Sequence, residues 1–240
     1  MARRATALKD LRESGKTRGP LLLIAGPYEF LPYDDSEKRP DAKDLNPLAQ
    51  AFERFSYDAF CLAPEEAEAL TSQGVAIPKD WIVLGPEPQS RIIKKDGLTI
   101  AALFFPMQEK MNEPPSDKLM DKVSRAAKEL RDKADLVVGV SPWGLNAEET
   151  FTKLKKGAVD ILLGAGPGSG IYARAEPYGE SIWTRAYPKG KAINELELLA
   201  LPDRNQGKDK SSWELNANFK AVVLPLDDKL AADQEIDKLF

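Results

Sequence analysis

Small residues alternate with glycine directly after an apolar run, and this stretch is the strongest candidate for binding an anion. Residues 159–163 are Val-Asp-Ile-Leu-Leu, and residues 164–170 have the sequence GAGPGSG. Backbone N–H groups of such a loop bind phosphate when a helix begins at the glycines. Residues 171–183 instead contain Pro177 and Gly179, lack helical periodicity and bring no Lys-Ser or Lys-Thr pair of the P-loop type. We therefore favour a loop that keeps its shape through Gly and Pro over a phosphate cradle.

The chain lacks the residues of several common mechanisms. It contains no histidine and one cysteine, Cys61. Histidine is the commonest metal ligand and the commonest general base at neutral pH, so Ser-His-Asp, Cys-His and His-metal mechanisms are excluded within this chain. A single cysteine forms no intrachain disulfide, and the apolar neighbours of Cys61 predict a buried core thiol.

Two carboxylates and two tryptophans are further candidates, each with a structural alternative. Glu65 and Glu66 could act as an acid and base pair, but they also begin a predicted helix, where the helix dipole favours carboxylates. Trp143 and Trp183 could line a cleft and stack on a ligand, whereas aromatic residues near loops more often pack in the core. We favour the structural alternative in both cases. The charged residues 34–41 are expected to form a solvated loop.

The composition suits one large globular domain or two small ones. The 240 residues are 42% hydrophobic and 30% charged. The 34 Lys and Arg residues against 38 Asp and Glu give a net charge of -4, without a dense basic cluster, so we expect no nucleic-acid partner. No apolar run approaches the ~20 residues of a membrane span. The start, residues 1–15, lacks the apolar core of a signal peptide, so the leader of an exported protein would lie outside this sequence.

Amphipathic segments and apolar runs alternate along the chain, which predicts an α/β fold with mixed sheets flanked by helices. Helices are expected at 2–14, 46–55, 65–74, 116–134 and 146–157, and one begins at 233. Asn46, Ser116 and Asn146 are the expected N-caps, Pro47 the first residue of its helix, and Gly15 the end of the first helix.

Strands are expected where apolar runs are bounded by turn residues. Residues 95–97, Lys-Asp-Gly, predict a hairpin turn. Residues 179–190 and 192–201 alternate, which favours antiparallel strands on a second sheet. The expected strands are 19–26, 57–64, 81–85, 89–97, 98–106, 135–142, 159–164, 179–190, 192–201 and 214–226.

The order of these elements and several short motifs resemble the catalytic domain of the calcineurin-like metallophosphoesterases, especially the periplasmic 5'-nucleotidase and UDP-sugar hydrolase branch. Residues 2–15, ARRATALKDLRESG, resemble the helix that follows that family's first strand. LLLIAGP at 21–27 matches LLLDAGD, and YDAFCLAPEEA at 57–67 matches YDA…LGNHEFD. VSPWG at 140–144 matches LSHxG, and VDILLGAGPG at 159–168 matches VDIIIGGHTH. The resemblance implies a layered α-β-β-α sandwich.

The resemblance also places the positions of a two-metal site, and no aligned position keeps a metal-ligand side chain. These residues are expected to line a vestigial cleft. Pro27 stands where the family has the bridging aspartate, and Ala63 stands where it has the asparagine ligand. Pro64, with the retained Glu65 beside it, takes the place of the transition-state histidine. Pro142, with neighbouring Trp143, takes the place of the histidine of the third motif, and Gly166 and Gly168 take the places of the last two histidines.

The expected function is therefore a catalytically inactive, 5'-nucleotidase-like domain that acts as a scaffold or binding module and needs no cofactor. The alternative is hydrolysis of phosphate esters or nucleotides with metal ligands supplied by a segment outside this sequence, by Glu65 or Asp58, or by a partner chain. A small-molecule ligand in the vacated cleft is a third hypothesis.

The family's first strand, which carries Asp-x-His, has no match in this sequence. The expected domain covers 1–226 without that strand, and 227–240 begin a linker toward a further domain. An unfilled strand position exposes unpaired edges, which favour association, so we expect a homodimer, a strand exchange or another protein partner. The resemblance implies a periplasmic or exported protein.

Overall fold

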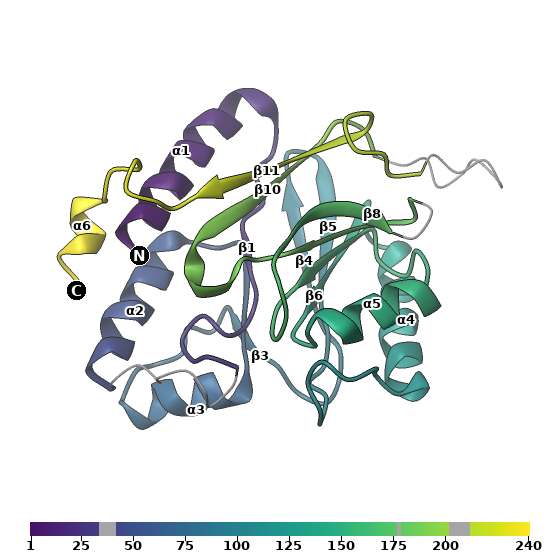
Figure 1. The fold of residues 1–240 in the computed structure, drawn as a ribbon, viewed down its shortest axis with the longest axis horizontal. Coiled ribbons are helices and arrows are strands. Elements are labelled where there is room, and N and C mark those ends of the chain that lie inside the picture. The colour runs from purple at the N-terminus through teal and green to yellow at the C-terminus, as the bar shows by residue number, and fades with distance from the viewer. Residues whose placement is uncertain (34–41, 177–178, 202–211) are drawn as a thin grey trace.

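The structure is a computed structural model that describes residues 1–33, 42–176, 179–201 and 212–240. Its helices are α1 (Ala2–Arg18), α2 (Ala42–Phe55), α3 (Pro64–Ser72), α4 (Asp117–Arg131), α5 (Leu145–Leu154) and α6 (Gln234–Asp237). Figure 1 shows α1, α2 and α3 on one side of the strands, and α4 and α5 on the opposite side. The predicted fold class is confirmed: mixed sheets are flanked by helices in a layered α/β arrangement.

The larger sheet has six strands in the order β4-β5-β6-β7-β9-β8. The four central strands run parallel, while β4 and β8 pair antiparallel at the edges. The strands are β4 (Gln89–Lys95), β5 (Leu98–Phe104), β6 (Leu136–Ser141), β7 (Ile161–Gly164), β8 (Ile171–Glu176) and β9 (Ser181–Arg185).

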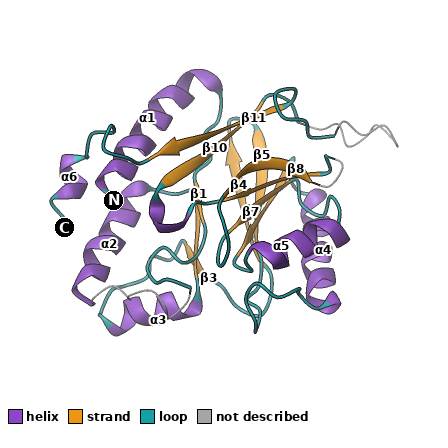
Figure 2. Cartoon of the chain, in the orientation of Figure 1, coloured by secondary structure: helices purple, strands orange, loops and turns teal. Residues whose placement is uncertain are grey.

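The second strand layer consists of two smaller sheets (Figure 2). One is parallel, in the order β1 (Ile24–Ala25), β2 (Ala59–Leu62) and β3 (Trp81–Val83). The other is the antiparallel pair β10 (Ala192–Leu198) and β11 (Phe219–Pro225). No strand joins β1 to β10 among the described residues.

Separate hydrophobic clusters hold the layers together. Phe52 and Leu70 pack α2 and α3 against β1 and β2. Val123 and Phe151 pack α4 and α5 against the outer face of the larger sheet. Its inner face meets β10, β11 and β1 in a third cluster that includes Ile161.

Elements with strong local signals form as predicted. Ser116 caps α4, where its hydroxyl accepts from the N–H of Leu119 at 3.3 Å. Residues 95–97 form the predicted hairpin turn, with Lys95 paired to Leu98 and with φ of 48° at Asp96 and 84° at Gly97. Both central residues therefore have the positive φ that a type I′ turn requires.

Three helix boundaries differ from the prediction because tertiary contacts outweigh local signals. Helix α1 continues through Gly15 and ends before Gly19. Helix α2 begins before Asn46 and contains Pro47, since its apolar face is buried against the core. Helix α5 begins at Leu145 after Gly144, and Asn146 is not its cap.

Two strand predictions also need correction. Residues 171–176 form β8, which was not predicted, and this strand is the antiparallel partner of β9. Strand β9 belongs to the larger sheet, parallel to β7, and every residue in it is buried. The strand predicted at 179–190 is present at Ser181–Arg185 with an antiparallel partner, but its predicted place on a second sheet is wrong. The strand predicted at 192–201 lies in the smaller antiparallel sheet as expected. The strand predicted at 19–26 shortens to Ile24–Ala25.

The C-terminal segment folds back on the N-terminal helix. Asp233 caps α6, pairs with Lys9, and donates its N–H to the carbonyl of Ala2 at 3.2 Å. The loop expected at 34–41 lies outside the described residues. In the described part of the chain, no helix combines the length and apolarity needed to cross a bilayer.

Candidate functional site

Four strands of the two layers end close together. Pro27 follows β1, Ala63 follows β2, Pro142 follows β6, and the GAGPGSG loop follows β7. A Cβ atom built on Gly26 would lie 3.5 Å from the Cβ of Ala165, so the ends of β1 and β7 are in contact. Five of the residues predicted to line a cleft therefore come from neighbouring strand ends, namely Pro27, Ala63, Pro142, Gly166 and Gly168.

The side chain of Tyr28 lies between these strand ends. Its hydroxyl donates to the carbonyl of Pro142 at 3.3 Å and lies 3.8 Å from the sulfur of Met111. A Cβ on Gly166 would lie 2.6 Å from the same Pro142 oxygen, so the glycine loop reaches the same point. Burial and then the charge of Glu66 raise the pKa of Tyr28, and its phenol therefore stays neutral.

Glu66 fixes the backbone that carries Tyr28. Its buried carboxylate accepts from the N–H groups of Tyr28, Phe30, Leu31 and Ala63 at 2.9, 2.8, 3.3 and 2.8 Å. Tyr28 has a φ of 71°, which non-glycine residues seldom adopt, and these bonds hold it there. Burial raises the pKa of Glu66 to about 7, against the opposing effect of the four N–H donors.

Glu65 and Glu66 face different surroundings. Glu65 and Pro64 are exposed, whereas Glu66 is 1% exposed. Both glutamates lie in the first turn of α3, with Pro64 as its first residue. The arrangement supports the helix-start alternative over an acid and base pair.

Both candidate tryptophans are fully buried in the cluster between α4, α5 and the larger sheet. Trp143 packs against Phe105 and Phe151, and its indole N–H donates to the carbonyl of Pro106 at 2.6 Å. Trp183 donates to a Glu148 carboxylate oxygen at 3.1 Å. Their burial supports the packing alternative.

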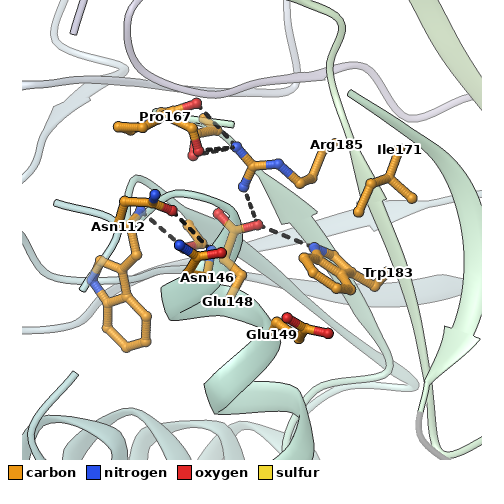
Figure 3. A network of polar contacts seen from close by, with 12 residues as sticks. Asn112, Asn146, Glu148, Glu149, Pro167, Ile171, Trp183 and Arg185 are labelled. Carbon is orange, nitrogen blue, oxygen red and sulfur yellow. Dashed lines mark hydrogen bonds and ion pairs between the residues drawn. The ribbon is translucent and has the colours of Figure 1, made fainter. Parts of the chain in front are cut away.

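The backbone carbonyl groups of the GAGPGSG loop bind the guanidinium of Arg185. Arg185 Nη2 donates to the carbonyls of Ala165, Gly166 and Pro167 at 3.2, 3.0 and 3.0 Å, and Nε donates to Ser169 at 3.1 Å. Figure 3 shows the guanidinium between the loop and helix α5. Because its carbonyl oxygens point at a positive charge, the loop presents the wrong polarity for holding an anion at that position.

The glycines serve this arrangement sterically. Gly166 and Gly168 have φ of 77° and 114°, where a side chain is strained. Gly164 lies against the ion pair, since a Cβ there would meet Glu148 Oε2 and lie 2.7 Å from Arg185 Cγ. The loop therefore needs glycine for backbone conformation and for close packing.

Arg185 is balanced by a buried carboxylate. Arg185 Nη1 pairs with Glu148 Oε2, and the side chains are 2% and 0% exposed (Figure 3). Burial raises the pKa of Glu148, while Arg185, Trp183 and the Ser141 hydroxyl oppose that rise. Sequence reasoning missed this pair, because the two residues are 37 positions apart and neither belongs to a motif.

Three of the eight predicted cleft residues line a cavity of about 970 Å³, namely Pro27, Gly166 and Gly168. Ala63, Pro64, Glu65, Pro142 and Trp143 do not contribute to its lining within the described residues. The ends of β1 and β7 thus border the cavity, whereas the ends of β2 and β6 lie outside its lining.

No protein-family profile matches the chain, and no curated protein matches it. Several solved structures are similar to this chain, and they include three from different organisms. The 5'-nucleotidase of Candida albicans SC5314 has a TM-score of 0.59 at 12% identity, over 98% of this chain and 50% of that chain. The NAD nucleotidase NadN of Haemophilus influenzae has a TM-score of 0.56 at 14% identity, over 81% of this chain and 40% of that chain. A hypothetical protein from Thermus thermophilus has a TM-score of 0.50 at 16% identity, over 77% of this chain and 69% of that chain.

The chain has the metallophosphoesterase fold. The resemblance found in the sequence is thereby confirmed for the fold. The chain spans half or less of the length of the two nucleotidases.

A metallophosphoesterase fold implies a two-metal centre, and the residues at these strand ends do not fit one. In the part of the chain that the structure describes, no three acidic or cysteine side chains gather at one point. The carboxylates of Glu66 and Glu148 are engaged by backbone N–H groups and by Arg185. Asp58, the other carboxylate considered, accepts from the Leu23 N–H and pairs with Lys95, both at 2.8 Å.

Proposed function

We propose that this metallophosphoesterase-like domain does not hydrolyse phosphate esters and serves as a scaffold or binding module. The observation that carries the proposal is the position of Tyr28. Its neutral phenol is bonded to Pro142, between the strand ends where the sequence resemblance puts the family's metal ligands.

The chemistry of the donor set supports the same proposal. Two-metal hydrolysis of a phosphate ester needs side-chain oxygen or nitrogen ligands that hold two cations a few ångströms apart. The aligned residues Pro27, Ala63, Pro142 and Gly166 have no such side-chain atoms. The chain also has no histidine to replace them.

The test is an assay of the purified chain with p-nitrophenyl phosphate and 5'-nucleotides, in the presence of Mn²⁺, Zn²⁺, Co²⁺ or Ca²⁺. We expect turnover no higher than a blank purified in parallel, and no stoichiometric metal by elemental analysis. Turnover that co-elutes with the protein and is abolished by a chelator would refute the proposal, as would about two equivalents of bound metal per chain.

Two further expectations remain proposals. The first is a domain that ends near residue 226, and the second is a periplasmic or exported location for the natural protein. The second is supported only by the family resemblance.

A further inference from the structure

The cavity of about 970 Å³ lies between the two smaller sheets. Strand β1 lines one side and strand β10 the other, while helix α1 and the inner face of the larger sheet line two further sides. The side chains from α1 and from the larger sheet are largely apolar, including Leu8, Leu11, Ile100, Val138 and Leu163. The cavity is therefore bounded by two strands and by two largely apolar walls.

Strand β1 turns one edge toward this cavity. The Leu23 N–H donates to the Asp58 carboxylate at 2.8 Å, and the Leu23 carbonyl accepts from the Ala59 N–H at 3.3 Å. Both groups therefore point toward β2. Backbone groups of successive residues in a strand point to opposite sides. The N–H and C=O groups of Leu22 and Ile24 therefore point away from β2, and both residues line the cavity.

Strand β10 has the same arrangement. Leu199 donates to Asn218 at 2.8 Å, and Lys191 accepts from Leu226 at 2.9 Å, so the odd-numbered residues bond to β11. By alternation, the even-numbered residues direct their backbone groups away from β11. Residues 192–199 all line the cavity, the even-numbered Ala192, Asn194, Leu196 and Leu198 among them, whereas no residue of β11 does.

Contacts on β11 agree with this alternation. Pro225, which has no N–H, lies opposite Ala192, where no bond across the pair is needed. The Ala221 carbonyl accepts from the Tyr172 hydroxyl, so it points away from β10.

Two rows of backbone donors and acceptors thus border one cavity with largely apolar walls. Backbone groups in such surroundings are costly unless they are bonded, and a polypeptide strand bonds both rows at once. A strand between two packed layers occupies about 160 Å³ per residue, from a 3.3 Å rise, a 4.8 Å strand spacing and a 10 Å layer spacing. The cavity volume then corresponds to about six residues.

We propose that this cavity binds an extended, apolar segment of another polypeptide, about six residues long, as a strand between β1 and β10. One face of the segment contacts Leu8 and Leu11 of α1, and the other contacts Ile100, Val138 and Leu163 of the larger sheet. A strand buried on both faces needs a nearly continuous apolar sequence. The inference rests on the proposed binding role and gives it a class of partner.

The probe is a fluorescein-labelled peptide, acetyl-Lys-Lys-Val-Ile-Val-Leu-Ile-Val-Lys-Lys-amide, titrated against the chain by fluorescence anisotropy. The control peptide has the same sequence with N-methyl groups on alternate central amides, which removes strand donors. We expect the control to bind at least tenfold more weakly. Hydrogen exchange with the unmethylated peptide should slow at residues 22–26 and 192–198.

Two variants localise the binding. Leu196→Pro removes an N–H that points into the cavity and leaves the bonds of β10 to β11 intact, so peptide affinity should fall at least tenfold. Val223→Pro is the matched control, because it removes an N–H on the far edge of β11, and it should bind like the wild type. Circular dichroism and urea midpoints establish that both variants fold.

Equal binding of the two peptides would refute the proposal without use of any variant. Protection from hydrogen exchange at residues outside 22–26 and 192–198 would also refute it. A dimer of this chain that excludes the peptide, and that Leu196→Pro dissociates, would refute it as well, because a second copy would then occupy the cavity. Hydrolysis is measured in a separate assay. A failure of peptide binding therefore does not bear on the proposed lack of hydrolysis, and detection of hydrolysis does not bear on peptide binding.

Discussion

The buried pair of Glu148 and Arg185 should be strongly coupled, and a double-mutant cycle measures that coupling. The variants are Arg185→Met, Glu148→Met and the double variant. Each single change leaves one charge buried without its partner, since the two side chains are 0% and 2% exposed. Loss of one member of a buried ion pair costs about 3–5 kcal/mol of unfolding free energy.

Arg185→Met should fall at the upper end of this range. It also removes the donors to the carbonyls of residues 165, 166, 167 and 169, at about 1 kcal/mol net for each hydrogen bond. The double variant has no unpaired charge, and replacement of a buried pair by apolar residues is often close to neutral. We therefore expect the loss of unfolding free energy in the double variant to be smaller than the summed losses of the two single variants by at least about 3 kcal/mol.

The assay is urea unfolding followed by tryptophan fluorescence, with free energies compared at equal m-values. Arg185→Lys is the conservative control, because it keeps the charge but loses the planar fork that reaches several carbonyls. It should be destabilised less than Arg185→Met. Additive single effects, with a double variant as unstable as their sum, would show that the pair is not coupled and would refute the reasoning.

Two further predictions concern neighbouring positions. Gly164→Ala should lower the free energy of unfolding by about 3 kcal/mol, because the added Cβ would meet the ion pair. The control Gly85→Ala has no atom within 4 Å of its Cβ and should lower it by less than about 1 kcal/mol. Similar urea midpoints for the two variants would contradict the packing described. The folded-state pKa of Glu66 is about 7 against an ordinary value of 4.5, so its stabilising contribution is full below about pH 4.5 and is lost as pH rises through 7. The free energy of unfolding should therefore fall by about 3 kcal/mol over this pH range, measured by urea unfolding. Glu66→Gln should abolish this pH dependence, because an amide does not titrate, whereas exposed Glu65→Gln should keep it. A rise in stability with pH that Glu66→Gln abolishes would show that the N–H donors outweigh burial.

Several elements were predictable because their signals are local. The cap of α4 depends on Ser116 and the N–H of Leu119, three residues apart. The hairpin at residues 95–97 depends on residues that tolerate positive φ. The apolar face of α4 follows from the 3.6-residue period, which places Met120, Val123 and Ala127 on one side.

Other elements depend on partners that are distant in the sequence. Helix α5 begins at Leu145, and the Asn112 side chain, 34 positions from Asn146, accepts the Asn146 N–H at 2.8 Å. Strand β9 is buried on both faces because Trp183 packs in the cluster with α4 and α5, whereas Ile182 packs in the cluster with β10 and β11. A period of two in its sequence therefore could not place it in the correct sheet.

At the candidate site, the amino-acid sequence by itself determined which donor atoms are missing, because composition and aligned positions contain that information without coordinates. Only the tertiary structure decided what replaces them. Tyr28 is 114 positions in the sequence from Pro142, whose carbonyl accepts its hydrogen bond. Glu66 accepts hydrogen bonds from N–H groups up to 38 positions away. The energy of a buried polar group depends on the partners that surround it, and those partners are brought together only when the layers pack.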